Sequence, residues 1–407
     1  MKKNLRHAQG KVAVAMSGPV KSLRSHGANQ KVAVALSGGV DSGVAAALLV
    51  KQGYQCAGFH MHLWKEPGSD VENKCCSTES LEAARKTAHQ LGMQFHTIDF
   101  SKIFKKRVVD YFLESYAAGL TPNPCVVCNQ FIKFGELFNY IKKLGFDYLA
   151  TGHYSRLMAE IPNSKFQIYH LLQAKDKSKD QSYFLYNLTQ TQLAQVLFPV
   201  GDYAKKQVRE MAKKWQLPVA ERPESQEICF FPETDYRPFL KRRLGKKIMP
   251  GKVVNTQGRM IGRHQGLPLY TIGQRHGFEI TDKKTIGPLY VITKKPKENQ
   301  LVVGFGKETE RREFEVEQVN WIDQNSKFKI QNSKFYVRIC HQGKLMPCQL
   351  TRVSNIKYRV SLIDPSRGIA PGQAAVFYGS ASPLATSSGP SGSPQAKEVL
   401  GGGIICY

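Results

Sequence analysis

The stretch Lys31-Val-Ala-Val-Ala-Leu-Ser-Gly-Gly-Val-Asp-Ser42 decides the fold class of this chain. Residues 32–36 form a short apolar run typical of a buried strand, and residues 42–51 are rich in Ala and Leu at helical spacing. The turn between them contains two glycines followed by Asp41. A glycine-rich turn that joins a strand to a helix lets backbone amides and the positive end of the helix hold a phosphate group. We therefore predict a phosphate-binding loop here.

The polar side chains of this loop suit nucleotide chemistry. Ser37 and Ser42 can donate hydroxyl groups, and Asp41 can hold Mg²⁺ against the phosphate charge. The loop is not a Walker loop, because no Gly-Lys-Ser/Thr sequence follows the glycines. The alternative is a tight turn without a ligand, which needs only one glycine and no Asp-Ser pair.

Short apolar runs and helical stretches alternate from this loop to about residue 153. We expect strands over residues 55–63, 94–100 and 147–151, and helices over residues 77–91, 104–117 and 130–144. Such alternation predicts an α/β domain in which a parallel sheet has helices on both faces.

The residue pattern of the sequence changes beyond a predicted helix over residues 204–217. Residues 251–277 are glycine-rich, and strands are expected over 290–304, 314–322, 335–341, 348–353 and 358–363. We therefore divide the chain into a basic extension (1–30), a catalytic nucleotide-binding domain (31–230), a small Gly-rich linker domain (231–305) and a β-barrel-like C-terminal domain (306–407). Residues 380–394 are expected to form a loop.

The extension contains a degenerate copy of the loop motif. Lys11-Val-Ala-Val-Ala-Met-Ser-Gly-Pro-Val20 nearly repeats the sequence that begins at Lys31, but Pro19 replaces the second glycine. Proline has no amide hydrogen for a phosphate group and fixes its own φ angle. We therefore expect residues 1–30 to be a loosely held, dispensable extension.

The chain is strongly basic. It carries 58 Lys and Arg against 32 Asp and Glu, and a formal net charge of +26. The first 30 residues hold only six of these bases, so the excess belongs to the main body. A field of this sign attracts polyanions, either nucleic acid or an anionic membrane. The sequence has no apolar run of about 18 residues and no signal peptide. We therefore expect no membrane partner and a cytoplasmic protein.

Cysteines occur in two polar motifs, Thr121-Pro-Asn-Pro-Cys-Val-Val-Cys-Asn129 and Glu224-Ser-Gln-Glu-Ile-Cys-Phe230. With a helix expected from residue 130, Cys128 lies near a helix N-terminus, where the dipole favours a thiolate. Three interpretations stay open at this point. They are a zinc site, which lacks its second ligand pair, a thioredoxin-like dithiol, and a nucleophilic cysteine paired with a sulfur-carrying one.

The loop sequence Ser37-Gly-Gly-Val-Asp-Ser42 resembles the signature of the PP-loop, or N-type ATP pyrophosphatase, family. Six further motifs resemble the bacterial tRNA-specific 2-thiouridylase family. They are Thr-Pro-Asn-Pro-x-x-x-Cys-Asn (121–129), Thr-Gly-His-Tyr (151–154), Lys-Asp-Gln-Ser (179–182), Glu-Ser-Gln-x-x-Cys-Phe (224–230), Tyr-Thr-Ile-Gly-Gln-Arg (270–275) and Ala-Pro-Gly-Gln-Ala-Ala-Val-Phe-Tyr (370–378). The resemblance runs from about residue 31 to residue 407.

The resemblance implies a function and a set of site residues. The enzyme would adenylate the C2 carbonyl of the wobble uridine in tRNA and replace its oxygen with sulfur, releasing AMP and pyrophosphate. Cys229 would carry a persulfide delivered by an upstream sulfur donor, and Cys128 would be the nucleophile that closes a transient disulfide with Cys229. ATP and Mg²⁺ would be bound by Ala35, Leu36, Ser37, Gly38, Gly39, Val40, Asp41, Ser42, Met61 and Gly152, with Asp41 on the metal. The tRNA would contact Asn123, Pro124, Cys125, His153, Lys179, Asp180, Gln181 and Gln373, and the linker domain over residues 231–305 would also bind it. We expect a monomer.

Two positions depart from the family pattern. Many members have Asp where this chain has Cys125, and the family's Arg-Tyr pair falls at Cys340-His341, with Arg338 nearby. One alternative is a thiolase that holds an iron–sulfur cluster with Cys125, Cys128 and Cys229. Another PP-loop adenylating synthetase and a non-enzymatic RNA-binding protein are further alternatives.

Overall fold

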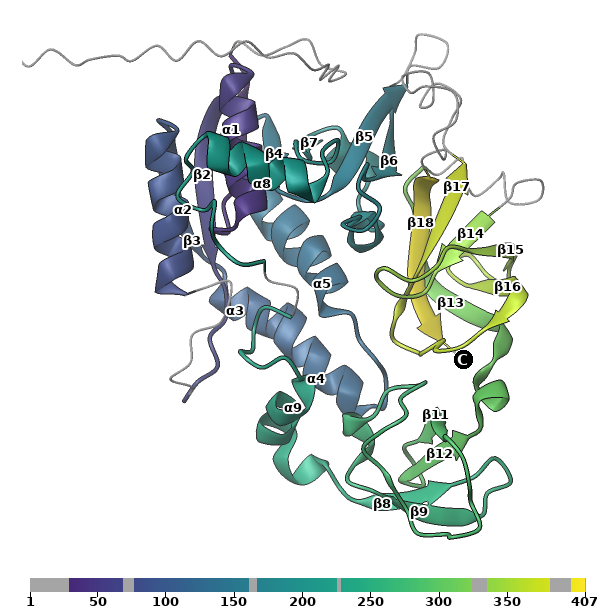
Figure 1. Ribbon diagram of the computed structural model, residues 1–407. Coiled ribbons are helices and arrows are strands. Elements are labelled where there is room, and N and C mark those ends of the chain that lie inside the picture. Colours follow the sequence, from purple (N-terminus) through teal and green to yellow (C-terminus); the bar gives the residue numbers. More distant parts are fainter. Residues whose placement is uncertain are drawn as a thin grey trace, which may run out of the picture.

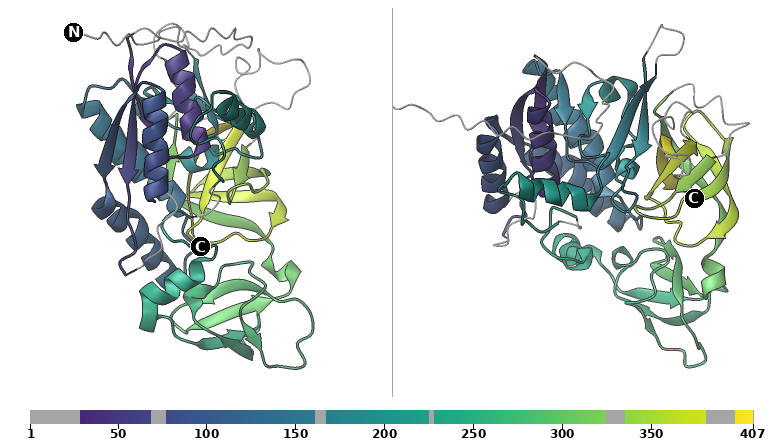
Figure 2. Two further views of the ribbon diagram at one scale, coloured as in Figure 1. Left: turned by 60° about the vertical axis from the view of Figure 1, so that its left-hand side comes forward. Right: turned by 45° about the horizontal axis from the view of Figure 1, so that its top comes forward.

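The computed structural model describes residues 29–68, 77–160, 167–224, 228–323, 335–380 and 397–406. Almost all of the N-terminal extension, and all but the first residue of the loop expected at 380–394, lie outside these ranges. Figure 1 shows an α/β unit, a β-barrel beside it and a small β unit at one end of the molecule. The two views in Figure 2 keep the small unit at that end.

The α/β unit is built on a five-stranded parallel sheet. Its strands are β1 (Lys31–Ala35), β2 (Gln55–His62), β3 (Gln94–Asp99), β4 (Tyr148–Ala150) and β7 (Val196–Leu197). The spatial order β3-β2-β1-β4-β7, with every pair parallel, confirms the predicted sheet. The chain moves outward in opposite directions from β1 and β4, and ligands bind at such switch points, outside the carboxyl ends of the strands.

Both faces of this sheet are covered by helices, as predicted. Val32, Val34 and Leu36 pack with side chains of α1 (Val40–Lys51) and α2 (Thr78–Gln90). Ala33 and Ala35 belong to a different cluster, which holds side chains of the helix over residues 128–143. Successive residues of a strand point to opposite faces of the sheet, so the apolar side chains of β1 are buried on both faces.

Two long helices begin earlier than the sequence predicts. The first consists of α3 (Ser101–Phe104), the π-helical η1 (Lys105–Val109) and α4 (Asp110–Ala117). The second consists of α5 (Pro124–Val127), the π-helical η2 (Cys128–Leu137) and α6 (Phe138–Lys143). The predicted start at residue 130 was wrong, because Asn123 caps the helix through its side chain and Pro124 takes the first helical position.

The C-terminal unit is a closed six-stranded barrel, as the fold prediction implied. Its strands are β13 (Arg311–Trp321), β14 (Phe335–Arg338), β15 (Met346–Arg352), β16 (Tyr358–Ser366), β17 (Ala374–Ser380) and β18 (Lys397–Cys406). The barrel closes where β13 pairs with β18. The sequence analysis missed β17, β18 and the hairpin of β5 (Ser155–Glu160) and β6 (Ile168–Gln173), which extends the barrel sheet through β18.

The small unit is built on a third sheet, which has both parallel and antiparallel strand pairs. It contains β8 (Gly251–Val254), β9 (Met260–His264), β10 (Glu279–Ile280), β11 (Tyr290–Lys295) and β12 (Gln300–Gly304). The single strand expected over 290–304 was wrong, because the chain reverses there and Asn299 adopts a φ of 47°. The other described helices are η4 (Ser182–Leu185), α7 (Gln190–Leu193), α8 (Lys205–Lys214), α9 (Tyr236–Leu244), η5 (Gly245–Lys247), η6 (Leu267–Leu269) and η7 (Gly306–Thr309).

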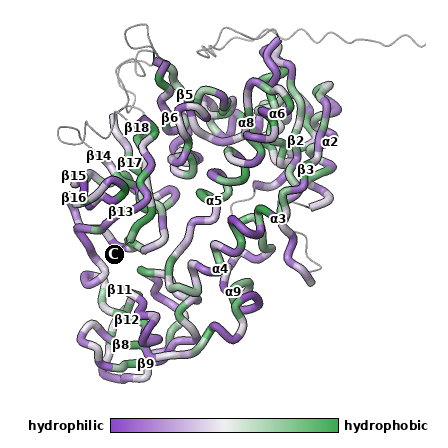
Figure 3. Tube along the Cα trace, turned by 180° about the vertical axis from the view of Figure 1, so that it is seen from behind, coloured by the Kyte–Doolittle hydropathy of each residue, from purple (hydrophilic) through white to green (hydrophobic). Residues whose placement is uncertain are grey.

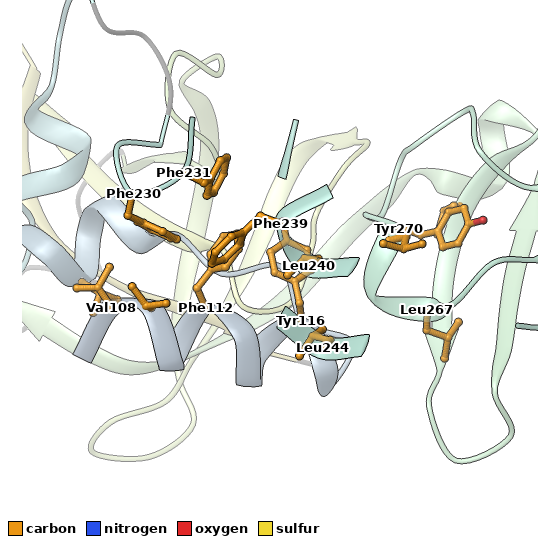
Figure 4. Close-up of a cluster of buried hydrophobic side chains, with 14 of the residues drawn as sticks. Val108, Phe112, Tyr116, Phe230, Phe231, Phe239, Leu240, Leu244, Leu267 and Tyr270 are labelled. Atoms are coloured by element: carbon orange, nitrogen blue, oxygen red, sulfur yellow. The ribbon is translucent and has the colours of Figure 1, made fainter. Parts of the chain in front are cut away.

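One hydrophobic cluster joins the α/β unit to the small unit. It contains Phe112 of α4 and Phe239 of α9, which are labelled in Figure 4. Val291 of β11 belongs to the same cluster. Along the helices in Figure 3, hydrophobic and hydrophilic residues alternate every few positions, as expected when only one face is buried. Within the described ranges, no helix has the length and apolar character needed to cross a bilayer.

Candidate active site

The two glycines of the phosphate loop have different structural roles. Gly38 has a φ of +76°, and a Cβ there would lie 2.1 Å from the carbonyl oxygen of Ser80, so only glycine lets the loop pack against α2. A Cβ on Gly39 would meet only the Oγ of Ser37, at 3.6 Å. Gly39 is also the N-cap residue of α1, and it has no side chain that could cover the amides of the first helical turn. The open side of the loop therefore lies at Gly39.

Gly152 lies directly against this loop. A Cβ at this position would come within 2.6 Å of the Ser42 amide nitrogen and 2.7 Å of the Asp41 carbonyl carbon. Gly152 follows β4 and the phosphate loop follows β1, so the two segments meet at the switch point of the sheet. Met61, close to the carboxyl end of β2, is partly buried nearby between two clusters. The sequence-predicted nucleotide residues thus gather at one edge of the sheet.

Asp41 is held by two side chains that the sequence analysis did not assign. The Lys205 ammonium lies 2.7 Å from both carboxylate oxygens, and the Tyr154 hydroxyl donates to one of them at 2.8 Å. Lys205 is only 9% exposed. Burial, and next the charge of Asp41, raises the pKa of Tyr154, which keeps the phenol protonated as a donor.

Glu224 extends this set of charges toward a predicted RNA residue. Its carboxylate lies 3.7 Å from the Lys205 ammonium and 2.9 Å from that of Lys179. Burial opposes ionisation of Glu224, but the Lys179 hydrogen bond and the charges of Lys205 and Lys179 lower its pKa overall. Asp41, Lys205, Glu224 and Lys179 therefore form one continuous chain of ion pairs.

The helix that begins at Pro124 changes the placement of the cysteines. Cys125 lies in its first turn and Cys128 in its second, whereas the sequence analysis put Cys128 near the N-terminus of a helix that was expected to start at residue 130. The helix dipole acts mainly on the first turn, so this argument for a thiolate at Cys128 was wrong. At Cys125 the dipole is outweighed, because burial, and next the neighbouring Cys229, raises the pKa of its thiol to about 11.

Cys229 is placed by the two aromatic residues that follow it. The ring centroid of Phe230 lies 5.3 Å from that of Phe112, and the Phe231 ring is stacked on Phe239 at 5.2 Å (Figure 4). Both phenylalanines are almost fully buried. Cys229 packs against the same cluster, which also contains Cys128. The tertiary structure thus brings the two predicted catalytic cysteines to one region.

The barrel contributes the remaining side of this region. The turn that contains Gln373 lies against the start of the cysteine segment, since the Thr121 amide donates to the Pro371 carbonyl at 2.8 Å. A Cβ on Gly372 would lie 2.9 Å from the same amide nitrogen. Gln373 is therefore brought near Asn123 and Cys125, as expected if these residues share one substrate.

Three other predicted RNA residues are placed deeper. His153 is buried, its Nδ1 lies 2.7 Å from the Thr151 hydroxyl, and burial lowers its pKa well below the usual value, so the ring is neutral. Asp180 is 1% exposed and pairs with Arg338 at 3.0 Å. Gln181 exchanges two hydrogen bonds with the Tyr154 backbone. In this arrangement Asp180 and Gln181 hold the loop that presents Lys179.

The seven cysteines that the structure describes are thiols. Within the described residues, no group of three or more His, Cys, Asp or Glu side chains is gathered as a metal site. The iron–sulfur alternative requires Cys125, Cys128 and Cys229 to be arranged as ligands of one metal centre, and in this structure they are not.

Lys205 carried a local signal that sequence reasoning overlooked. It is the first residue of α8, and basic side chains in a first turn oppose the helix dipole. A residue that breaks a local rule commonly serves a function or a tertiary contact. Tyr154 and Glu224 belong to motifs that the sequence analysis quoted. The motifs did not indicate which side chains these two residues contact.

Family models match three consecutive parts of the chain. They are a "tRNA methyl transferase HUP domain" over residues 30–233, a "tRNA methyl transferase PRC-barrel domain" over residues 237–305 and an "Aminomethyltransferase beta-barrel domain" over residues 311–405.

Curated relatives match almost the whole chain. The tRNA-specific 2-thiouridylase MnmA of Carboxydothermus hydrogenoformans is 42% identical over 383 residues, which are 92% of this chain and 97% of the relative. The protein of the same name from Clostridioides difficile is 38% identical over 378 residues, 93% of this chain and 98% of the relative. A solved 4-thiouridine synthetase–RNA complex with bound ATP covers 54% of this chain and 50% of its own, with 18% identity and a TM-score of 0.31, too low to carry an argument.

Proposed function

Since the chain belongs to the tRNA-specific 2-thiouridylase family, we propose that it is a tRNA-uridine 2-sulfurtransferase that uses ATP and a cysteine persulfide. The observation that carries the proposal is that Cys229 lies close to Cys125 and packs in the same cluster as Cys128. The helix that bears Cys125 and Cys128 contacts His153 through Phe134, and the preceding Gly152 lies against the phosphate loop. A methyltransferase, which the family models name, needs neither this loop nor a pair of reactive thiols.

The glycines of the loop leave room for ATP. Gly39 leaves room in front of uncapped helix amides, and the Ser37 and Ser42 hydroxyls, 3.3 Å apart, lie beside it. These groups would bind the phosphates, and Gly152 and Met61 would line the nucleoside side. The carboxylates of Asp41 and Glu224 are hard oxygen ligands of the kind that Mg²⁺ takes together with phosphate oxygens. When bound, Mg²⁺ would neutralise charge on the departing pyrophosphate.

In the first half-reaction the C2 oxygen of the uracil attacks the α-phosphorus of ATP. The α–β phosphoanhydride bond breaks, pyrophosphate leaves, and the N3 proton of the base is lost. The oxygen is now part of an AMP leaving group, which departs far more readily than oxide or hydroxide. Asn123, Pro124 and Gln373 would hold the base beside the cysteine helix during this step.

In the second half-reaction sulfur replaces the activated oxygen. The terminal sulfur of the Cys229 persulfide attacks C2, and the C2–O bond breaks with release of AMP. The Cys128 thiol then loses its proton and attacks the Cys229 Sγ, which breaks the bond to the transferred sulfur and forms a Cys128–Cys229 disulfide. The base regains its N3 proton as a 2-thiouracil. A dithiol reductant must reduce the disulfide, and a sulfur donor must reload Cys229.

The basic surface supports tRNA as the substrate. The net charge of +26 favours a polyanion, and Lys179 is presented by a loop that Asp180 anchors in the interior. Phosphate contacts position an RNA, while a splayed-out base is recognised by polar groups in a pocket. We infer that the wobble uridine is the target, as in the family that the sequence resembles.

The proposal is tested by thiolation of unmodified tRNA in vitro with ATP, Mg²⁺, a persulfide donor and a dithiol, followed by nucleoside analysis. The expected product is 2-thiouridine at the wobble position. Cys229→Ser should carry no persulfide at that position, whereas Cys128→Ser should load Cys229 yet transfer no sulfur. Both variants should still adenylate. Cys406→Ser, which changes a barrel thiol, is the matched control and should act like wild type.

Several results would contradict the scheme. Formation of 4-thiouridine or no thionucleoside would overturn the assignment of the reaction. Persulfide on Cys128 but not on Cys229 would reverse the two cysteine roles. An activity that also requires Cys125 and is accompanied by an iron chromophore would favour the cluster mechanism.

A further inference from the structure

Lys205 lies at the centre of the phosphate site, and its surroundings fix where it can act. Its backbone amide donates to Asp176 at 3.0 Å, which anchors the start of α8. Val208 and Ala212 of the same helix pack in one cluster with Val40 and Val44 of α1. The ammonium is therefore delivered to the phosphate loop by a rigid helix rather than by a loose surface side chain.

The ammonium occupies the place that a metal ion needs. Mg²⁺ lies about 2.1 Å from each carboxylate oxygen that it binds. Lys205 lies 2.7 Å from both oxygens of Asp41 and 3.7 Å from Glu224, so it bridges the two carboxylates best placed to take a metal. A cation cannot bind both carboxylates while the ammonium lies between them.

We propose that Lys205 is a phosphate-binding residue that guards the metal position: it neutralises Asp41 and Glu224 in the nucleotide-free protein and turns to the polyphosphate when Mg²⁺ enters with ATP. This inference rests on the proposed use of ATP. An ammonium on a four-carbon stem is a mobile point charge that suits such a change of partner. In this scheme the metal does not bind without the nucleotide, because only the phosphates offer the displaced ammonium a new anionic partner.

A purely structural ion pair between α8 and α1 is the competing explanation. It predicts that loss of the ammonium lowers stability and leaves ligand affinities unchanged. The guarding role predicts opposite changes for two ligands. Removal of the charge frees the carboxylates for a divalent cation, and it also removes a charged donor to phosphate.

The test compares Lys205→Met with Lys206→Met in the full-length protein. Lys206 is the next residue of the same helix and is exposed, so the pair matches in chemistry and differs in place. Electron paramagnetic resonance measures binding of Mn²⁺ alone, and equilibrium dialysis measures ATP binding in EDTA. Lys205→Met should bind Mn²⁺ at least about 10-fold more tightly than wild type. It should bind ATP in EDTA about 10- to 100-fold more weakly, because the carboxylates of Asp41 and Glu224 then face the polyphosphate without a counter-charge. Lys206→Met should stay within about threefold of wild type in both assays.

The outcomes separate this inference from the function on which it rests. If wild type binds ATP and Lys205→Met matches Lys206→Met in both assays, Lys205 is only a structural residue. If wild type binds no ATP, the proposed function and this inference both fail. Lys205→Gln, checked by thermal unfolding, takes the place of Lys205→Met should the methionine variant not fold. Lys205→Arg, which keeps the charge, should exclude Mn²⁺ as wild type does.

Discussion

The phosphate loop and the cysteine segment belong to one unit but are organised by opposite means. Around the loop, charges hold one another, and Asp41 is fixed by Lys205 and Tyr154. Around the cysteines, aromatic packing holds the chain in place. Burial there, and next the neighbouring Cys229, raises the pKa of the Cys125 thiol to about 11. The first region is prepared for a charged ligand before it arrives. The second keeps the Cys125 thiol protonated near neutral pH.

The largest effect is expected for Asp41→Ala, which removes the carboxylate that Lys205 and Tyr154 hold in the phosphate-loop region. Loss of the carboxylate removes the expected metal ligand and leaves Lys205 to interact with Glu224 alone. Pyrophosphate release should fall by roughly 100- to 1,000-fold, in the range seen when one preorganised electrostatic group is lost. Binding of tRNA should change less than about threefold. A coupled pyrophosphate assay and a filter-binding titration provide the two measurements.

The control for that variant is Asp147→Ala. Asp147 accepts a hydrogen bond from the Lys31 amide at 2.8 Å, at the opposite end of β1 from the loop. This variant should release pyrophosphate at nearly the wild-type rate. Near-normal release from Asp41→Ala would show that the loop assignment is mistaken.

In the cysteine segment, Phe230→Leu weakens the aromatic packing next to Cys229. The smaller side chain loses ring contacts with Phe112 and Phe239, so the free energy of unfolding should fall by about 1–3 kcal/mol. Because Cys229 precedes this anchor, thiolation at 25 °C should fall about 10-fold while adenylation is retained. Unfolding in urea and the two half-reaction assays measure these effects.

Phe377→Leu, in the core of the barrel, is the matched change in another cluster. It should cost similar stability and leave sulfur transfer near the wild-type rate. If both variants lose thiolation equally, the effect is general destabilisation rather than misplacement of Cys229.

The smallest effect is expected for Cys125→Ser. A thiol with a pKa of about 11 is neutral near pH 7.5, so a hydroxyl replaces it without a change of charge. Thiolation should decrease less than about fivefold, with the same pH profile from pH 7 to 9, measured by initial rates. A loss above about 100-fold would mean that Cys125 reacts or binds iron, and the contrast drawn above would not hold.

Local signals were enough to predict four of the five strands of the parallel sheet, but not β7. The apolar run of β1, its glycine turn and the Ala/Leu stretch of α1 each specify their own conformation, so the order of strands and helices followed from the sequence. The start of α5 was also encoded, because Asn123-Pro124 is a capping sequence, but it was taken for a loop. The hairpin β5–β6 was missed because its place depends on pairing with β18, which comes more than 200 residues later.

The sequence by itself determined the class of the α/β unit, the phosphate loop and the motifs that assign the chain to its family. Only the tertiary structure decided that Lys205 meets Asp41, that Cys229 lies beside Cys125 and that a barrel turn reaches Thr121. The physical reason is the range of the interactions. Backbone propensity and helix capping act within a few residues, whereas the direction of a side chain and the burial of its charge depend on distant elements packed against it.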